Sequence, residues 1–425
     1  MKDGLHFGYA ESVITPGRNI GLAGYAQRAE SGFNNSGVLD ELFARALCLR
    51  MGEETLLIVT LDLCNLFTAD ADAIRTAVHD KTGVPVSNIL LSVSHTHSGP
   101  VTNARPGNAD LHPENIAAVQ AYTQELRDGI VTLCAEAGAR MRHAHLSTIT
   151  YRAGLGYNRR LTVKDSDGKA HAKMIFNLWR HDRSEPQGST DPDMPVLMFE
   201  THPAAQEDDY LAQNAANRVV LFNCALHPVV MGKHNRYVSA DYVGAARRCL
   251  ERTLGAGTRA MFLLGACGDI NPALATQYNP HAVDIVGNAI GYGIATVLAM
   301  RKPIEVDCVK AIEDRVPIEG PDEAAIRIQT LRIGEACIAA VSGEAFTELG
   351  IHVRRRSPFA QTLIATNTNG CMSYFPTREA FALGAYEIER ARKKGYDETL
   401  LERIEDALVA NLARLRNLDQ PDFGR

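Results

Sequence analysis

The chain has 425 residues, of which 45% are hydrophobic and 22% charged, and its formal net charge is −6. This balance is typical of a globular protein with a sizeable core and excludes intrinsic disorder. A mildly acidic chain without a basic block also lacks the electrostatic signature of a nucleic-acid-binding protein. Because no stretch approaches about 20 consecutive apolar residues, we expect no integral membrane segment.

The N-terminal region and the cysteines favour a cytoplasmic protein. Residues 1–9 lack the apolar core of a secretory signal peptide. The nine cysteines are scattered singly, without a C-x-x-C pair, and several of them, such as Cys64 and Cys224, lie in apolar runs. This distribution is typical of reduced core cysteines and not of a disulfide framework or a cysteine-based zinc site.

Short apolar runs alternate with amphipathic segments along the chain. The first part predicts a hairpin, a helix, a buried strand and a long helix, at residues 46–61, 70–81, 89–93 and 113–137. In the hairpin, two apolar runs flank Gly52-Glu-Glu, which predicts a loop longer than two residues.

The second part predicts a β-rich run, a helix, a strand, another helix, several β stretches and a charged C-terminal helix, at residues 219–226, 241–254, 260–264, 281–300, 306–341 and 397–415. Residues 182–215, rich in Ser, Pro, Gln, Asp and Gly, predict a surface excursion. Because hairpins and strand–helix units both occur, the predicted fold class is α/β, with mixed β-sheets flanked by helices. We expect residues 1–425 to form a single large domain.

The most distinctive segment is Ser94-His95-Thr96-His97-Ser98-Gly99-Pro100, directly after the predicted strand 89–93. Residues two apart in an extended chain point to the same side, so His95 and His97 are expected to converge. Ligands of α/β proteins gather at the carboxyl ends of strands. The segment therefore favours a metal or catalytic site over two histidines that only cap a strand.

Four further segments place polar residues after a predicted strand or in a polar loop. These residues are His227, which precedes Pro228, then Asp269 with Asn271 in a Gly-rich turn, then Glu344, and finally Tyr374. Taken singly, each has an ordinary interpretation: a core histidine, turn-forming residues, a glutamate at a helix start and a loop tyrosine.

Together and in this order, the five segments resemble the neutral ceramidase family of zinc-dependent amidases. The block at residues 94–100 is the most specific part of the resemblance, which spans roughly residues 8–390. Its other parts are Ile14-Thr-Pro16, Leu22-Ala-Gly-Tyr25, Ala44-Arg-Ala46, Leu61-Asp62-Leu63, Asn158-Arg159, Ala240-Asp241-Tyr-Val-Gly244 and Tyr386-Glu387.

The resemblance implies a catalytic zinc-hydrolase domain with one Zn²⁺ held by His95, His227, Glu344 and Tyr374. It further implies that His97 lies beside the metal-bound water and that Arg159 contacts the substrate or the transition state. The chemistry agrees, because two imidazoles and a carboxylate leave an open position on zinc, which lowers the pKa of its bound water to about 7. The phenol of Tyr374 is either the fourth ligand or a donor to the developing charge.

Two departures from the family pattern bear on the substrate. Asn271 stands where the ceramidases have a serine, and Ser342-Gly343-Glu344 replaces their Pro-Gly-Glu string. The C-terminal β-sandwich domain of the long members is expected to be absent. A carboxamide near the zinc suits a polar group, so Asn271 joins the candidate catalytic residues, and a soluble acylated compound is expected in place of ceramide.

These observations predict a cytoplasmic zinc-dependent hydrolase that cleaves a linear amide bond in a small acylated substrate, with no nucleic-acid partner. A homo-oligomer is compatible with the sequence. Two alternatives stay open. An esterase or lactonase would use the same zinc site without protonating an amine leaving group, whereas a non-catalytic metal-containing binding protein would keep the fold without turnover.

Overall fold

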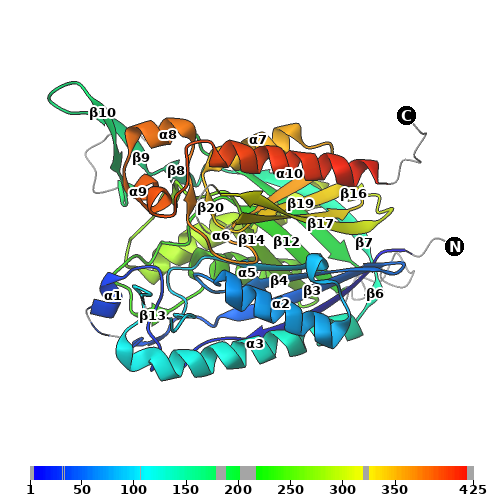
Figure 1. Ribbon diagram of the computed structural model, residues 1–425. Helices are drawn as coiled ribbons and strands as arrows, with labels where there is room; N and C mark the ends of the chain where they lie inside the picture. Colours follow the sequence, from blue (N-terminus) through cyan, green and yellow to red (C-terminus); the bar gives the residue numbers. More distant parts are fainter. Residues whose placement is uncertain are drawn as a thin grey trace.

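Three β-sheets form the framework of the protein (Figure 1). The computed structural model describes residues 4–30, 32, 34–105, 107–178, 188–201, 217–318 and 325–418. Each sheet packs one face against its own helices. Figure 1 shows α3 along one side of the molecule and α10 along the opposite side.

The first sheet has the strand order β5-β4-β3-β1-β6 and is mixed, because β4 and β5 are parallel while the other neighbours are antiparallel. Its strands are β1 (His6–Val13), β3 (Phe43–Met51), β4 (Glu54–Leu61), β5 (Ile89–Val93) and β6 (Arg142–His143). Helices α2 (Thr68–Thr82) and α3 (Ile116–Ala139) cover one face.

The second sheet has the order β14-β12-β11-β7-β16 and is also mixed, with β12 and β14 parallel. Its strands are β7 (His145–Arg152), β11 (Asp193–Glu200), β12 (Arg218–Cys224), β14 (Thr258–Leu264) and β16 (Lys302–Ile304). Helices α5 (Asp241–Leu254) and α6 (Pro280–Val297) cover one face.

The third sheet has the order β17-β18-β19-β21, with β19 and β21 parallel. Its strands are β17 (Val309–Pro317), β18 (Ala325–Ile333), β19 (Ala336–Val341) and β21 (Gln361–Ala365). The helices packed against it are α7 (Thr347–Arg356), α8 (Arg378–Leu383), α9 (Tyr386–Lys393) and α10 (Leu400–Asn417).

The other faces of the three sheets share one hydrophobic cluster, in which Ile58 of β4, Leu221 of β12 and Ile338 of β19 take part. Strands that are buried on both faces need apolar residues at successive positions, because side chains alternate between the faces. In β4, for example, Ile58 belongs to this shared cluster whereas Val59 packs toward α2 and α3.

Short ladders and helices connect the framework. The ladders pair β2 (Gly37–Val38) with β13 (Tyr237–Val238), β8 (Gly156–Asn158) with β15 (Ile270–Pro272), β9 (Arg160–Lys164) with β10 (Ala170–Met174), and β20 (Glu344–Ala345) with β22 (Tyr374–Phe375). The short helices are α1 (Gln27–Glu30) and the 3₁₀ turns Val86–Asn88, Pro113–Asn115 and Leu298–Met300.

The predicted α/β class with mixed sheets and flanking helices is confirmed, and the helix predicted at 241–254 has the bounds of α5. The hairpin loop was predicted too long. Met51 pairs with Glu54, so the loop is only Gly52-Glu53. Gly52 has a φ of 58°, which suits a two-residue turn because such turns need a left-handed residue. The single-domain expectation stays a prediction.

The prediction of a surface excursion over residues 182–215 is wrong for residues 193–200. This segment forms β11, which lies between β7 and β12 in the middle of the second sheet. Its run from Met194 to Phe199 is buried throughout. The polar residues on both sides dominate the composition of the wider segment and hide this short apolar strand. The rest of the predicted excursion lies mostly outside the described residues.

One helical stretch in the described part of the chain, Pro280–Met300, is long and apolar enough by composition to cross a membrane. Its helix α6 packs closely on α5: a Cβ at Gly287 would lie 2.4 Å from the Cβ of Ala245, and one at Gly291 would lie 2.6 Å from that of Cys249. A core helix passes the same test of length and hydropathy. The expected absence of an integral membrane segment therefore stays a prediction.

Candidate metal centre

The candidate site lies where the carboxyl ends of strands from all three sheets meet. His95 follows β5, His227 follows β12, and Glu344 begins β20 shortly after the end of β19. β20 pairs in parallel with β22, and this register places Tyr374 opposite Glu344. The fold thus brings together four residues that the sequence separates by up to 279 positions, from 95 to 374.

Two imidazoles converge on one carboxylate. Nε2 of His95 lies 3.4 Å from Oε2 of Glu344, and Nε2 of His227 lies 3.2 Å from the same oxygen. The opposite edge of each ring faces a backbone carbonyl: Nδ1 of His95 lies 2.7 Å from the oxygen of Cys64, and Nδ1 of His227 lies 2.6 Å from that of Cys267. These carbonyls fix the proton on Nδ1 and leave the Nε2 lone pairs directed at the carboxylate, which is how metal-binding histidines are oriented.

His95 and His97 converge, but not through an extended backbone. His95 has a φ of 65°, a left-handed conformation that is uncommon for residues other than glycine. Its N–H donates to the carbonyl of Leu63 at 2.9 Å, which anchors this turn at the end of the first sheet. Nε2 of His97 lies 3.2 Å from Nε2 of His95, and the rings meet edge to face.

Gly24 packs directly against the ring of His97. Gly24 has a φ of 98°, and a Cβ there would lie 2.6 Å from Nδ1 of His97. That Nδ1 is buried without a hydrogen-bond partner in the described part of the chain. The Tyr25 ring lies 4.9 Å from the His97 ring, centroid to centroid. His97 is thus held by close packing, and its Nε2 is the nitrogen that faces the site.

The pKa values in the cluster show that the buried carboxylate of Glu344 is stabilised by a positive charge beside it. Burial acts to raise the pKa of Glu344, but the charge of His95 outweighs it, so this pKa lies well below its usual range. Burial acts to lower the pKa of His95, yet the charge of Glu344 raises it well above the usual value. Burial lowers the pKa of His227 to about 4 and that of His97 well below its usual value. Within the protein alone, a proton on His95 supplies the positive charge that a bound cation would otherwise supply.

Among the residues that the structure describes, two groups of side chains have ligand atoms close enough to hold a metal ion: His95 with His227 and Glu344, and His95 with His97 and Cys64. In the second group, Sγ of Cys64 lies 3.9 Å from Nδ1 of His95, whereas His97 faces Nε2 on the opposite edge of that ring. A single ion cannot bind both edges of one imidazole. The group of His95, His227 and Glu344 therefore fits a divalent cation better, and its two nitrogens and one oxygen suit zinc.

The predicted Arg159 is buried beside Tyr374, and two of its three side-chain nitrogens are held by oxygen acceptors. Its Nε donates to Oε1 of Glu387 at 3.0 Å and its Nη2 to the carbonyl of Gly268 at 2.7 Å. The guanidinium carbon lies 5.7 Å from the ring centre of Tyr374. Burial acts to lower the pKa of Arg159, but Glu387 outweighs it and raises this pKa, so the side chain is a permanent cation.

The other two predicted site residues are placed close to this arginine. Oδ1 of Asn271 lies 3.5 Å from Nη1 of Arg159, at the outer limit of a hydrogen bond. Burial raises the pKa of Tyr374 well above its usual value, and the charge of Glu344 adds to this. Whether Tyr374 is a metal ligand stays a prediction, as do the catalytic roles of Asn271, Arg159 and His97.

Sequence reasoning missed the groups that orient the site. The carbonyls of Cys64 and Cys267 belong to the backbone, so no residue type marks them. The sequence shows Glu387 as part of a Tyr-Glu pair, but it does not predict a place for this residue in the site. Its only signal is a carboxylate at the start of a helix, which has an ordinary interpretation.

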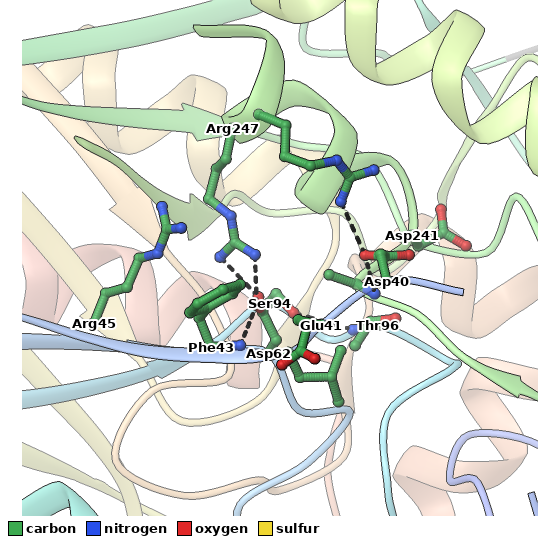
Figure 2. Close-up of polar contacts among 12 residues, drawn as sticks. Asp40, Glu41, Phe43, Arg45, Asp62, Ser94, Thr96, Asp241 and Arg247 are labelled. Carbon is green, nitrogen blue, oxygen red and sulfur yellow. Dashed lines mark hydrogen bonds and ion pairs between the residues drawn. The ribbon is translucent and has the colours of Figure 1, made fainter. Parts of the chain in front are cut away.

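A second buried cluster of charges lies nearby (Figure 2). Figure 2 shows Arg247 reaching from α5 to Asp62, which follows β4. Nη1 of Arg247 donates to Oδ1 of Asp62 at 2.8 Å, Nη2 donates to the other oxygen, and the N–H of Phe43 also donates there at 2.9 Å. This pair connects α5 to the end of the first sheet, next to the segment that contains Ser94 and His95.

The fold and the site define a mixed α/β protein with a candidate metal centre of two histidines and one glutamate at the carboxyl ends of its strands. The family model for the N-terminal part of neutral/alkaline non-lysosomal ceramidases matches residues 6–282. The chain therefore belongs to this ceramidase family, and that membership implies a hydrolase. A search of the curated proteins gave no match.

Solved structures share the fold. A crystal structure of neutral ceramidase from Pseudomonas aeruginosa, 19% identical, superposes with a TM-score of 0.76 over 98% of this chain and 75% of that chain. A ceramidase complexed with C2, 18% identical, gives a TM-score of 0.74 over 98% of this chain and 76% of that chain. These similarities confirm the resemblance and the fold class that the sequence predicted.

Proposed function

We propose that the protein is a zinc-dependent hydrolase that cleaves the amide bond of a small acylated substrate. The observation that carries the proposal is the convergence of His95, His227 and Glu344 on one point, with both Nδ1 atoms held by backbone carbonyls. When bound, a zinc ion supplies Lewis-acid chemistry and lowers the pKa of water to about 7, which provides a nucleophile at neutral pH.

The residues around the candidate metal ligands suit the remaining tasks of amide hydrolysis. His97 is neutral at neutral pH because burial lowers its pKa, and a proton on its Nε2 can be donated to the carbonyl oxygen of the substrate. Arg159 is a fixed cation beside Tyr374, where it can hold an anionic group of the substrate or of the transition state. The phenol of Tyr374 lies opposite Glu344, where it can donate to developing negative charge.

We further propose that the substrate carries a polar group near the scissile bond, as N-acyl amino acids and N-acyl sugars do. Arg159 and Asn271 support this, because a guanidinium and a carboxamide are both suited to carboxylates and hydroxyls. Both side chains are buried, with exposed fractions of 5% and 1%. An apolar group placed against them would leave these polar atoms without partners.

The proposal is tested with zinc-loaded protein on matched panels of N-acyl amino acids, N-acyl sugars, esters, lactones and ceramide in vesicles. We expect turnover of the soluble amides, with His352→Ala, at a half-exposed histidine of α7 that pairs with Glu405 and not with the candidate ligands, behaving as the wild type. Efficient cleavage of vesicle ceramide with soluble amides untouched would contradict the substrate class. Turnover of esters or lactones alone would favour that alternative, and the absence of any turnover would leave a metal-binding protein.

A further inference from the structure

Glu387 is a fully buried carboxylate that holds two adjacent arginines. Its side chain is 0% exposed, and it lies at the start of α9. Oε1 accepts from Nε of Arg159 at 3.0 Å, and Oε2 accepts from Nη1 of Arg160 at 2.6 Å. Each carboxylate oxygen is therefore paired with a different arginine. The two arginines are neighbours in the chain, where β8 is followed by β9.

The partners of Arg159 determine which of its N–H groups face the site. A guanidinium has five N–H donors in a rigid plane. Glu387 takes the Nε side and the Gly268 carbonyl takes Nη2, so Nη1 is directed toward Asn271 at 3.5 Å. The same guanidinium lies over the Tyr374 ring. Without an anchor at Nε, the bond from Nη2 to the Gly268 carbonyl would be the main restraint on this plane at the end of a long side chain.

Arg160 fixes the helix that carries Glu387. Its Nη2 donates to the carbonyl of Gly384 at 2.7 Å, in the turn between α8 and α9. The next residue, Ala385, has a φ of 84°, a conformation that a non-glycine residue keeps only when its surroundings hold it. Arg160 thus binds both the turn before α9 and the first turn of α9 itself, which sets the position of Glu387.

We infer that Glu387 is a positioning residue for the reaction: it orients the Arg159 guanidinium toward Tyr374 and the substrate, and Arg160 in turn holds Glu387. This inference rests on the proposed function, because it assigns Glu387 to the same site. The role is indirect, since the contacts of Glu387 described above are with the two arginines and not with the candidate metal ligands.

The test compares Glu387→Gln with Glu389→Gln, an exposed glutamate on the same helix, in the wild-type and Arg159→Lys backgrounds. Gln keeps the size of the side chain but removes its charge and turns an N–H₂ group toward one arginine. We expect Glu387→Gln to lower kcat roughly 10- to 100-fold with KM changed less, because small displacements of a positioning group have effects of this size. In the Arg159→Lys background the same change should lower kcat less than about threefold, since the two residues act as one unit. Glu389→Gln should match the wild type in both backgrounds.

Two further measurements separate orientation from damage to the fold or the metal site. Metal content per chain should be equal in the wild type and in Glu387→Gln. In ¹⁵N-arginine-labelled protein, the Nε–H signal of Arg159, assigned by its loss in Arg159→Lys, should shift in Glu387→Gln but not in Glu389→Gln. If Glu387→Gln does not fold, Glu387→Asp, which keeps the charge but shortens the reach, should show the same dependence on Arg159.

The outcomes distinguish this inference from the proposed function. Equal kinetics for Glu387→Gln and Glu389→Gln, or equal losses of kcat in both backgrounds, would overturn the positioning role while the hydrolase stands. If the wild type hydrolyses none of the acyl substrates, the proposed function fails. In that case the Nε–H signal still decides the inference: a shift in Glu387→Gln supports the orientation of Arg159 by Glu387, and an unchanged signal overturns it.

Discussion

Two buried clusters of charged groups lie close together at the end of the first sheet, and they are built in opposite ways. In the Asp62–Arg247 pair, every carboxylate oxygen faces a donor, either the guanidinium or the N–H of Phe43. In the cluster of His95, His227 and Glu344, acceptor atoms face one another across 3.2 to 3.4 Å. In the first cluster the carboxylate is fully compensated within the protein, whereas in the second it needs a proton or a cation.

The difference shows how a ligand site can be told from a structural ion pair when both are buried. A buried carboxylate is tolerated when hydrogen bonds and an opposite charge compensate it, as at Asp62. At Glu344 the nearest groups are imidazole nitrogens, and their other nitrogens already face carbonyls. The orientation of those rings, and not the number of charges, therefore identifies the second cluster as the candidate metal centre.

The largest expected effect is on activity when a candidate ligand is removed. His95→Ala and His227→Ala should each reduce hydrolysis to background, because the remaining donors hold a metal ion poorly. The measurement is the initial rate on the best substrate of the panel, at equal protein and zinc concentrations. His352→Ala is the matched control. A tenth of the wild-type rate in either ligand variant would contradict the assignment.

A smaller effect is expected at His97, which faces the cluster without being assigned as a ligand. His97→Ala should keep most of the metal and lose roughly 10²–10⁴ in rate, the usual range for acid–base assistance. Rate and metal content are measured on the same preparation. Metal loss as severe as in His95→Ala would make His97 a ligand and contradict its separate role.

Removing one partner of the Asp62–Arg247 pair should lower the stability of the fold. Arg247→Met leaves Asp62 buried without its cation, so we expect the free energy of unfolding to fall by about 3–5 kcal/mol. Arg248→Met on the same helix removes an arginine that is 49% exposed and pairs with Asp40, and about 0–1 kcal/mol is expected there. Denaturant unfolding of the zinc-loaded proteins measures both. Equal losses of unfolding free energy in the two variants would show that the buried Asp62–Arg247 pair stabilises the fold no more than the exposed arginine does.

The smallest expected effect is the stability that metal binding adds. At a free zinc concentration 100 times its Kd, binding stabilises the folded state by about 2.7 kcal/mol. Chelation should therefore lower the Tm of the wild type and of Arg247→Met by a few degrees, and leave that of His95→Ala unchanged. Thermal unfolding with and without chelator provides the comparison. A chelator shift in His95→Ala equal to that of the wild type would place the metal elsewhere.

Much of the framework could be predicted because its signals are local. α5 has an amphipathic pattern that can be recognised without knowledge of its neighbours, and β5 is a short apolar run followed by Gly99-Pro100. β11 was missed because its apolar core of six residues is flanked by polar sequence. Its burial depends on β7 and β12, which are distant in the chain, so tertiary contacts and not local composition decide its structure.

The residue types of the site could be predicted, but its geometry could not. His95, His227 and Glu344 each follow a strand, which the sequence shows, yet their strands belong to three different sheets. The convergence of His95 and His97 was expected from an extended backbone, whereas the structure achieves it with a left-handed residue at His95. Side-chain orientation by the carbonyls of Cys64 and Cys267 depends on the backbone path and leaves no mark in the sequence.

The most direct test of the account is X-ray absorption spectroscopy at the zinc edge, combined with elemental analysis of the purified protein. We expect one zinc per chain in the wild type, with only nitrogen and oxygen ligands at about 2.0–2.2 Å. His95→Ala should contain no stoichiometric zinc. A protein without bound divalent metal after zinc loading, or a first shell with sulfur at about 2.3 Å that disappears in Cys64→Ser, would contradict the centre of His95, His227 and Glu344.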